Sequence, residues 1–139
     1  MPAAHKKRIL IVDDDVCFAQ VIKCALEKTG AYDVRSEDEA FRAVSTARAY
    51  QPDLILLDLV MPGLQGGDVA SLFQDDAALT NVPLVILSAT LPWRSTTTPE
   101  RIIGGHAFLA KPVSLDVLIH CIEGRTGGVR AQSAGIVGP

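Results

Sequence analysis

Short apolar runs alternate with longer amphipathic stretches along most of this chain. The strand-like runs fall at residues 8–12, 32–36, 54–57, 83–87 and 107–109. Between the first two runs, apolar side chains recur at helical spacing, at Phe18, Val21, Ile22 and Ala25. Gly30 then supplies a stop signal. Strands that alternate with helices favour βαβ units, so the pattern predicts a parallel sheet with helices on both faces.

Three further helices are expected, and one stretch is poorly suited to a helix. The helical patterns are carried by Ala40, Val44 and Ala47, by Val69, Leu72 and Phe73, and by Leu115, Leu118, Ile119 and Ile122. Ser114 would cap the last helix, and Gly124 would lie beyond its end. Residues 92–99 are rich in Pro and Thr, which leaves only residues 100–103 for one or two helical turns. We therefore expect the α/β class, with a doubly wound five-stranded parallel sheet and a weak or shortened fourth helix.

Composition places the chain among ordinary globular domains. It has 139 residues, of which 48% are hydrophobic and 21% charged, and this suits one domain. A net charge of -3 gives no electrostatic footprint for nucleic acid. No apolar run approaches the roughly 18 residues of a membrane span, and none suits a signal peptide. Cys17, Cys24 and Cys121 lack metal-binding spacing, so we expect buried, reduced thiols in a cytoplasmic protein.

Aspartates follow two of the strand-like runs. Asp13, Asp14 and Asp15 directly follow the first run. Asp58 ends the third run and precedes a Pro-Gly turn at residues 62–63. In a doubly wound sheet these two strand ends are neighbours beside the topological switch point. Carboxylates crowded there repel one another unless a cation lies among them, and Mg²⁺ suits such oxygen ligands. Asp15 alone could instead cap the next helix, and for that residue both interpretations stay open.

Two other polar residues follow the remaining strands. Ser88 follows the fourth run and Lys111 the fifth, which adds a hydroxyl and an ammonium to the same edge of the sheet. Each alone could be an ordinary cap or turn residue. Together with the acids and a cation they indicate a phosphoryl-transfer site, where electrostatic stabilisation does most of the work. Asp58 would be the nucleophile, while Lys111 and Ser88 would each hold a phosphoryl oxygen.

Four motifs, in this order, resemble the receiver domain of bacterial two-component response regulators. They are residues 9–15 (ILIVDDD), residues 52–63 (PDLILLDLVMPG), Ser88-Ala89 and Lys111-Pro112. The resemblance covers residues 6–124 and leaves residues 125–139 as a flexible Gly-rich tail or the start of a linker. It implies a flavodoxin-like fold with strand order 2-1-3-4-5.

The resemblance also implies a function in phosphorelay signal transduction. Asp58 would accept a phosphoryl group from the phosphohistidine of a sensor histidine kinase or a histidine phosphotransfer protein. The expected ligands of Mg²⁺ are Asp14, Asp58 and the backbone carbonyl of Val60, with Asp13 holding a metal-bound water. Such a domain is no enzyme and catalyses only its own phosphorylation and dephosphorylation. Phosphorylation would switch partner interactions, and a homodimer on activation fits the family. No contact with nucleic acid or a membrane is implied.

The resemblance assigns a switch as well as a site. Ser88 and Phe108 match the family's switch pair, in which the hydroxyl moves toward the phosphate and the aromatic ring follows inward. Phe108 lacks the hydroxyl of the commoner Tyr. The output surface departs from the family, because the fourth helix is weak and the spacing from Ser88 to Lys111 is one residue longer than usual. We expect residues 91–105, which contain Trp93, to be mobile at rest and to gain order on phosphorylation.

Two other interpretations stay open. A pseudo-receiver would keep this fold and bind partners without being phosphorylated. A phosphatase of the haloacid dehalogenase class would also use an Asp nucleophile, Mg²⁺, a hydroxyl and a lysine, with Asp13 and Asp15 in its first motif. However, Cys17 stands where that motif requires Thr or Ser, and Asp58 with its Pro-Gly turn would be unexplained.

Overall fold

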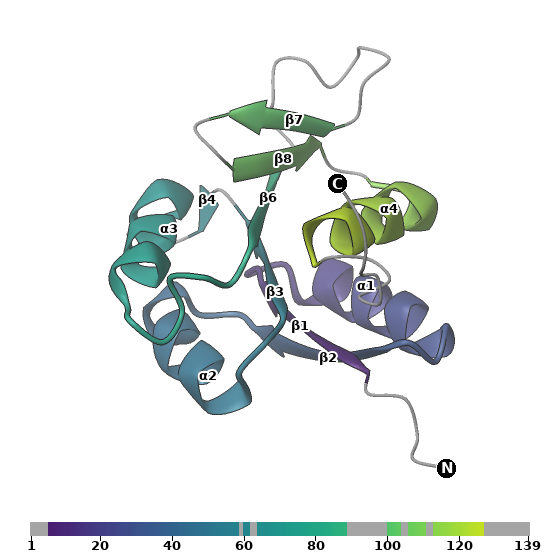
Figure 1. The fold of residues 1–139 in the computed structure, drawn as a ribbon, viewed down its shortest axis with the longest axis horizontal. Coiled ribbons are helices and arrows are strands. Elements are labelled where there is room, and N and C mark those ends of the chain that lie inside the picture. The colour runs from purple at the N-terminus through teal and green to yellow at the C-terminus, as the bar shows by residue number, and fades with distance from the viewer. Residues whose placement is uncertain are drawn as a thin grey trace, which may run out of the picture.

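Strands and helices alternate in the computed structural model (Figure 1), which describes residues 6–58, 60–61, 64–88, 100–103, 106–110 and 113–126. The strands are β1 (Lys7–Val12), β2 (Tyr32–Glu37), β3 (Leu54–Asp58), β4 (Val60–Met61), β5 (Leu64–Gln65), β6 (Leu84–Ser88), β7 (Glu100–Ile103) and β8 (His106–Ala110). The helices are α1 (Val16–Lys28), a 3₁₀ turn (Ala40–Arg42), α2 (Ala43–Tyr50), α3 (Gly66–Asp75) and α4 (Leu115–Arg125). Among the described residues, no helix is long and apolar enough to cross a bilayer.

Within the described residues, the main sheet contains six strands in the order β2-β1-β3-β6-β8-β7. Its first five members pair in parallel. With β6 and β8 counted as the fourth and fifth strands, this is the 2-1-3-4-5 order that the resemblance implied. Side chains of the central strands are fully buried on both faces, including Ile9–Val12 of β1 and Leu54–Leu57 of β3. The predicted doubly wound, five-stranded parallel sheet is therefore confirmed.

The sixth strand, β7, corrects the expectation for the fourth helix. Residues 100–103, where one or two helical turns were predicted, form a strand antiparallel to β8, with Arg101 opposite Phe108. The two isoleucines of this segment favour an extended backbone. Pairing with β8 also supplies hydrogen bonds that an isolated helical turn would lack. The remainder of the expected mobile segment around Trp93 lies outside the described residues.

Helices cover both faces of the sheet, and each face has its own apolar core. α1 and α4 lie on one side, and α2 and α3 lie on the other (Figure 1). Successive side chains of β1 point to opposite faces of the sheet. Ile9 and Ile11 pack on the α1–α4 side, and Leu10 and Val12 pack on the α2–α3 side. Burial of each such side chain contributes roughly 1.5–3 kcal/mol. The central strands are thus rigid supports for the loops at their ends.

The buried face of α1 differs from the predicted one. The residues buried against the sheet are Ala19, Ile22 and Leu26. Val21, a member of the predicted apolar face, is instead 65% exposed. Cys17 and Cys24 are exposed too, so the expectation that they are buried is wrong, and Cys121 is buried. Apolar residues lie on two sides of this helix, and periodicity alone did not identify the inner one.

The ends of α1 and α4 are set by local capping. Asp15 and Ser114 each accept a hydrogen bond from the backbone N–H three residues later, at 3.0 Å and 3.2 Å. Gly30, with a φ of +81°, takes the left-handed conformation that follows the end of α1. Gly124, by contrast, lies inside α4 rather than beyond its end. The cap predicted at Ser114 is confirmed, and Asp15 caps α1, which was one of the two interpretations left open for it.

A polar cluster at the amino end of the sheet fastens α4 to β1 and β2. Lys7 Nζ donates to Glu123 Oε1 at 2.7 Å and to Thr126 Oγ1 at 2.9 Å. The Tyr32 hydroxyl donates to Glu123 Oε2 at 2.5 Å. Partial burial opposes ionisation of Glu123, but the bonds from Lys7 and Tyr32 outweigh it and lower the pKa of Glu123. Burial, and then the bond to Glu123, raises the pKa of Tyr32. We call these four residues the amino-end cluster.

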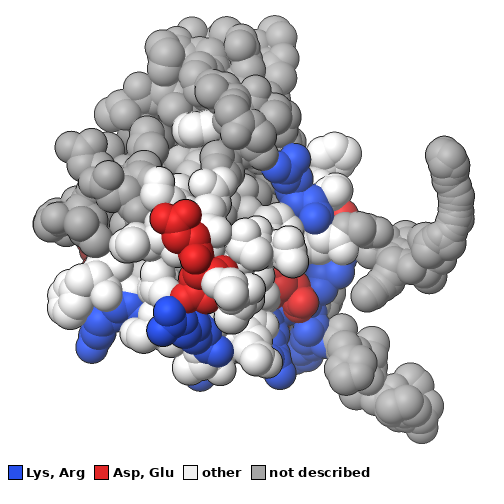
Figure 2. Space-filling model, turned by 60° about the vertical axis from the view of Figure 1, so that its left-hand side comes forward, with Lys and Arg blue, Asp and Glu red and all other residues white. Residues whose placement is uncertain are grey.

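Charged side chains of both signs share the side of the molecule that carries α2 and α3. Figure 2, which turns this side forward, shows basic residues beside acidic ones within its described part. Arg42 Nε lies 3.3 Å from Glu37 Oε2, and Arg48 pairs with Asp76. Pairing of this kind agrees with the small net charge of -3.

Candidate functional site

Three carboxylates meet at the carboxyl edge of the parallel sheet. Asp13 directly follows β1, and Asp58 is the last residue of β3. Since Val12 is paired with Leu57 in these adjacent strands, Asp13 and Asp58 come side by side. One carboxylate oxygen from each of Asp13, Asp14 and Asp58 lies within 4.8 Å of the other two. The structure thus brings together the acids that the sequence pattern predicted as neighbours, and we call them the acidic edge.

The members of the acidic edge differ in exposure. Asp13 is 1% exposed and Asp58 is 8% exposed, whereas Asp14 is open to solvent. Like charges repel more strongly in a partly buried site than in water. Carboxylate oxygens are also the ligands that hard divalent cations prefer. The acidic edge therefore offers a set of oxygen ligands that a divalent cation could use.

Asp13 is fixed in place by bonds on both sides. Its backbone N–H donates to the carbonyl of Glu37 at 3.0 Å, which ties the loop to the end of β2. Its Oδ1 accepts from the backbone N–H of Asp15 at 2.9 Å. Asp15 Oδ1 in turn caps α1 by accepting from the N–H of Phe18. Asp15 therefore acts as the helix cap, which was one of the two interpretations left open for it.

Glu37 is a buried acid beside the site that the sequence analysis did not single out. Thr46 Oγ1 donates to its Oε1 at 2.7 Å, and the backbone N–H of Glu39 donates to Oε2 at 3.1 Å. Arg42 supplies the compensating charge. These bonds anchor the end of β2, and Glu37 in turn anchors Asp13. Its position directly after the second strand-like run was the signal that could have identified it.

Ser88 is brought to the same edge by strand register. Asp58 pairs with Leu87 of β6, so the backbone of Ser88 lies one residue beyond Asp58. Ser88 pairs in turn with Ala110, the last residue of β8. Lys111, which follows Ala110, lies outside the described residues. The strand register therefore places the backbone of Ser88, at the end of β6, beside Ala110, the residue that precedes Lys111.

Phe108 and Val60 complete the predicted set. Phe108 is paired with Ile86 and is partly buried against the core on the α2–α3 side. Val60 begins β4, two residues after Asp58, and pairs with Gln65 in a small antiparallel hairpin. The predicted Pro-Gly turn at residues 62–63 lies outside the described residues.

Comparison with known proteins gives concordant results. Residues 9–123 match the family described as the response regulator receiver domain. The DNA-binding response regulator MtrA of Mycolicibacterium paratuberculosis is 31% identical over 124 residues, covering 86% of this chain and 51% of MtrA. The polar-differentiation response regulator DivK of Brucella anthropi is 28% identical over 123 residues, covering 87% of this chain and 97% of DivK. The receiver domain of the Francisella response regulator 1452 superposes with a TM-score of 0.72 at 28% identity, covering 91% of this chain and all of that domain.

The chain combines a doubly wound α/β sheet with the acidic edge, and its relatives are response regulators. These features are those of receiver domains, the signalling modules of two-component systems. The chain belongs to the response regulator receiver domain family. This membership decides against the dehalogenase-type phosphatase. The chain spans about half the length of the MtrA proteins that it matches.

Proposed function

We propose that Asp58 is the phosphoacceptor, and that the phosphoryl group comes from the phosphohistidine of a sensor histidine kinase or a histidine phosphotransfer protein. The observation that carries this proposal is the acidic edge, with carboxylate oxygens of three residues within 4.8 Å of one another. Asp58 is the member that ends a central, buried strand, β3, next to β6. Receiver family membership supplies the class of donor.

Asp13, Asp14, Asp58 and the Val60 carbonyl would hold a divalent cation, most suitably Mg²⁺. Oxygens on opposite sides of a six-coordinate Mg²⁺ lie about 4.2 Å apart. A cluster within 4.8 Å therefore fits such an ion after small side-chain adjustments. When bound, the cation offsets the negative charge of the carboxylates and of the phosphoryl oxygens.

Transfer joins a carboxylate oxygen of Asp58 to phosphorus while the bond from phosphorus to the donor imidazole nitrogen breaks. Ser88 would donate a hydrogen bond to one phosphoryl oxygen, and the ammonium of Lys111 would pair with another. Phe108, one strand away from Ser88, would follow the serine inward. The domain would act on no other substrate, and would catalyse only its own phosphorylation and dephosphorylation.

Phosphorylation would change which partners the domain binds. MtrA is named as a DNA-binding response regulator, and DNA binding is a property of that relative. For this chain we propose output through protein contacts near β8, which carries Phe108, and α4, which follows β8 in the chain, including a homodimer on activation. Phe108 in β8 would report the state of Ser88 to that surface.

The test is intact-mass measurement after incubation with Mg²⁺ and acetyl phosphate. The wild-type protein should gain one phosphate that hydroxylamine removes, as expected for an acyl phosphate. Asp58→Asn should gain none. Asp75→Asn, at an exposed acid on α3, is the matched control and should be labelled like the wild type. An unchanged label in Asp58→Asn would contradict the assignment of Asp58 as the phosphoacceptor. No label in the wild type would favour a pseudo-receiver.

A further inference from the structure

Glu37 is bonded through its main chain to a member of the acidic edge. Its backbone carbonyl accepts the Asp13 N–H at 3.0 Å, and Glu37 is paired with Val12 in the sheet. β2 is an edge strand, so β1 is its only neighbour in the sheet within the described residues. The end of an edge strand opens easily unless contacts outside the sheet hold it. The position of Asp13 therefore depends on what fixes the end of β2.

The carboxylate of Glu37 fixes the end of β2 with both of its oxygens. Oε1 accepts from Thr46 Oγ1 of α2 at 2.7 Å, and Oε2 accepts from the backbone N–H of Glu39 at 3.1 Å. Arg42, in the 3₁₀ turn, places its Nε 3.3 Å from the same Oε2. Glu37 is only 8% exposed, and bonds to a charged group of this kind are strong and directional. We call Glu37, Arg42 and Thr46 the β2-end cluster.

Small residues of α2 let this helix approach the sheet closely enough for Thr46 to reach Glu37. Ala43 and Ala47 are fully buried on the inner face of α2, and Thr46 directly precedes Ala47. The distance between packed elements depends on the size of the side chains at their contact. Larger residues at these two positions would hold Thr46 away from Glu37. The β2-end cluster thus follows from the sequence of α2.

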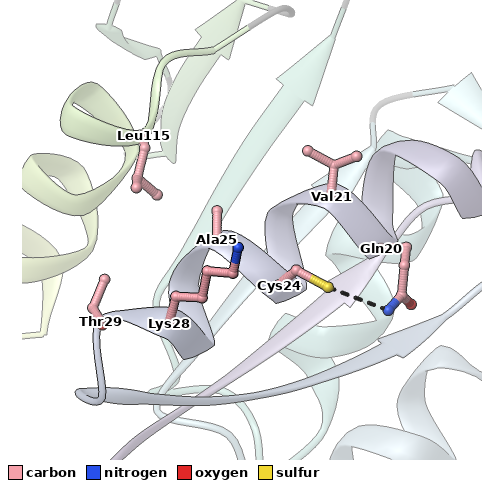
Figure 3. Close-up of a pocket in the computed structure, with 7 residues that line it drawn as sticks. All are labelled: Gln20, Val21, Cys24, Ala25, Lys28, Thr29 and Leu115. Carbon is pink, nitrogen blue, oxygen red and sulfur yellow. Dashed lines mark hydrogen bonds between the residues drawn. The ribbon is translucent and has the colours of Figure 1, made fainter.

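On the other face of the sheet, the groove beside α1 adds no contact to the acidic edge. α1 begins next to that edge and runs away from it, because it leads from the end of β1 to the start of the parallel strand β2. The groove has a volume of about 580 Å³ and is lined mainly by α1 from Gln20 onward, with Leu115 of α4 on its other side (Figure 3). The hydrogen bond drawn there joins Gln20 to Cys24 of the same helix. The β2-end cluster, by contrast, is tied to Asp13 through the Glu37 carbonyl.

We propose that Glu37 is a positioning residue of the acidic edge. The β2-end cluster holds the Glu37 carbonyl, and with it Asp13, where the site can take a divalent cation. This inference rests on the proposed function, because it concerns the same cation site. Partners that fix the ligands of a metal ion contribute roughly 10–100-fold to metal affinity. Asp13 keeps its bond from the Asp15 N–H when Glu37 is changed, so we expect roughly tenfold, the lower end of that range.

Titration of the whole chain with Mg²⁺, followed by the NMR signal of the Asp13 amide, tests the proposal. Glu37→Ala should weaken Mg²⁺ binding by roughly tenfold. Thr46→Val, which removes one bond of the β2-end cluster without a change of charge, should weaken it by a smaller factor. Asp38→Asn is the matched control, because it removes a neighbouring negative charge, 4.0 Å from Arg42, and no hydrogen bond to β2. It should bind Mg²⁺ nearly as the wild type does, since exposed charges are screened by salt.

Hydrogen exchange of the Asp13 amide without Mg²⁺ measures the positioning directly. This N–H donates to the Glu37 carbonyl, so Glu37→Ala should speed its exchange several-fold, and Asp38→Asn should not. Thr46→Val should act in the same direction as Glu37→Ala, and circular dichroism should show that each variant is folded.

Three results would overturn the inference. One is a Mg²⁺ affinity that Glu37→Ala and Asp38→Asn lower equally, because loss of charge alone would then explain it. Another is an Asp13 amide that exchanges at the wild-type rate in both Glu37→Ala and Thr46→Val. A wild-type protein that binds no Mg²⁺ would contradict the proposed cation site itself, and this inference with it.

Discussion

The charged side chains at the two ends of the parallel sheet are arranged in opposite ways. At the amino end, Lys7 and Tyr32 both donate to Glu123, so one carboxylate is met by a cation and a hydroxyl. At the carboxyl end, Asp13, Asp14 and Asp58 place three carboxylates within 4.8 Å, two of them buried. In the amino-end cluster, the carboxylate of Glu123 accepts hydrogen bonds from other residues of the chain. The acidic edge places like charges together, and they repel one another.

This difference separates stability from function within one small fold. Natural proteins break the rules of favourable packing and charge mainly at functional sites, and compensate elsewhere. The amino-end cluster holds α4 against β1 and β2, so it supplies such compensation. Under the proposed function, the acidic edge keeps its repulsion because its oxygens would bind a cation and accept a phosphoryl group. Mutations at the two ends should therefore change the free energy of unfolding in opposite directions.

Loss of the amino-end cluster should give the largest change in stability. Glu123→Ala removes the acceptor of both Lys7 and Tyr32 and should lower the free energy of unfolding by about 2 kcal/mol, since hydrogen bonds to charged groups are stronger than neutral ones. Urea unfolding measures the change. Asp75→Ala, an exposed acid on α3, is the control and should leave stability nearly unchanged. If the two variants are equally stable, the amino-end cluster does not hold the fold together.

Relief of repulsion at the acidic edge should have the opposite sign and a smaller size. Without divalent ions, Asp14→Asn should raise the free energy of unfolding by about 1 kcal/mol, a value discounted for the exposure of this residue. Added Mg²⁺ should stabilise the wild type more than the variant, because the variant has lost a ligand. Thermal melts with and without Mg²⁺ measure both effects. Equal stabilisation of the two proteins by Mg²⁺ would show that Asp14 is not a ligand.

The pH dependence of the amino-end cluster should give the smallest effect. The pKa of Glu123 is lowered in the folded protein, so its stabilising contribution is fully present above its ordinary pKa of 4.5. That contribution is lost as the pH falls below 4.5 and through the lowered pKa. The stability difference between the wild type and Glu123→Gln should therefore be constant from pH 6 to about pH 5 and shrink at more acidic pH. A difference that grows on acidification would mean that the pKa is shifted the other way.

The acidic edge could be predicted from sequence because it depends only on which residues end neighbouring strands. Asp13 and Asp58 follow apolar runs directly, and parallel pairing of those runs is enough to bring them together. The surroundings of Glu37 could not be predicted, since Arg42 in the 3₁₀ turn and Thr46 in α2 reach it only after the chain turns back toward the sheet. These contacts depend on tertiary packing and not on a local pattern.

Two other features show the limits of periodicity. Residues 100–103 are too few to distinguish a helical turn from a strand, and pairing with β8 decided the outcome. α1 has apolar residues on two sides, so the pattern around Val21 fitted a buried face that the sheet does not cover. In both cases the missing information was the partner surface. The strand ends needed no such information, which is why the site was more predictable than its surroundings.

The most direct test of the central claim is to locate the phosphoryl group in the labelled protein. After incubation with Mg²⁺ and acetyl phosphate, borohydride reduction converts an acyl-phosphorylated aspartate to homoserine. Peptide sequencing by mass spectrometry then identifies the position. The account predicts homoserine at Asp58 alone, with Asp13 and Asp14 unmodified. Homoserine at Asp13 or Asp14, or at any residue other than Asp58, would contradict it.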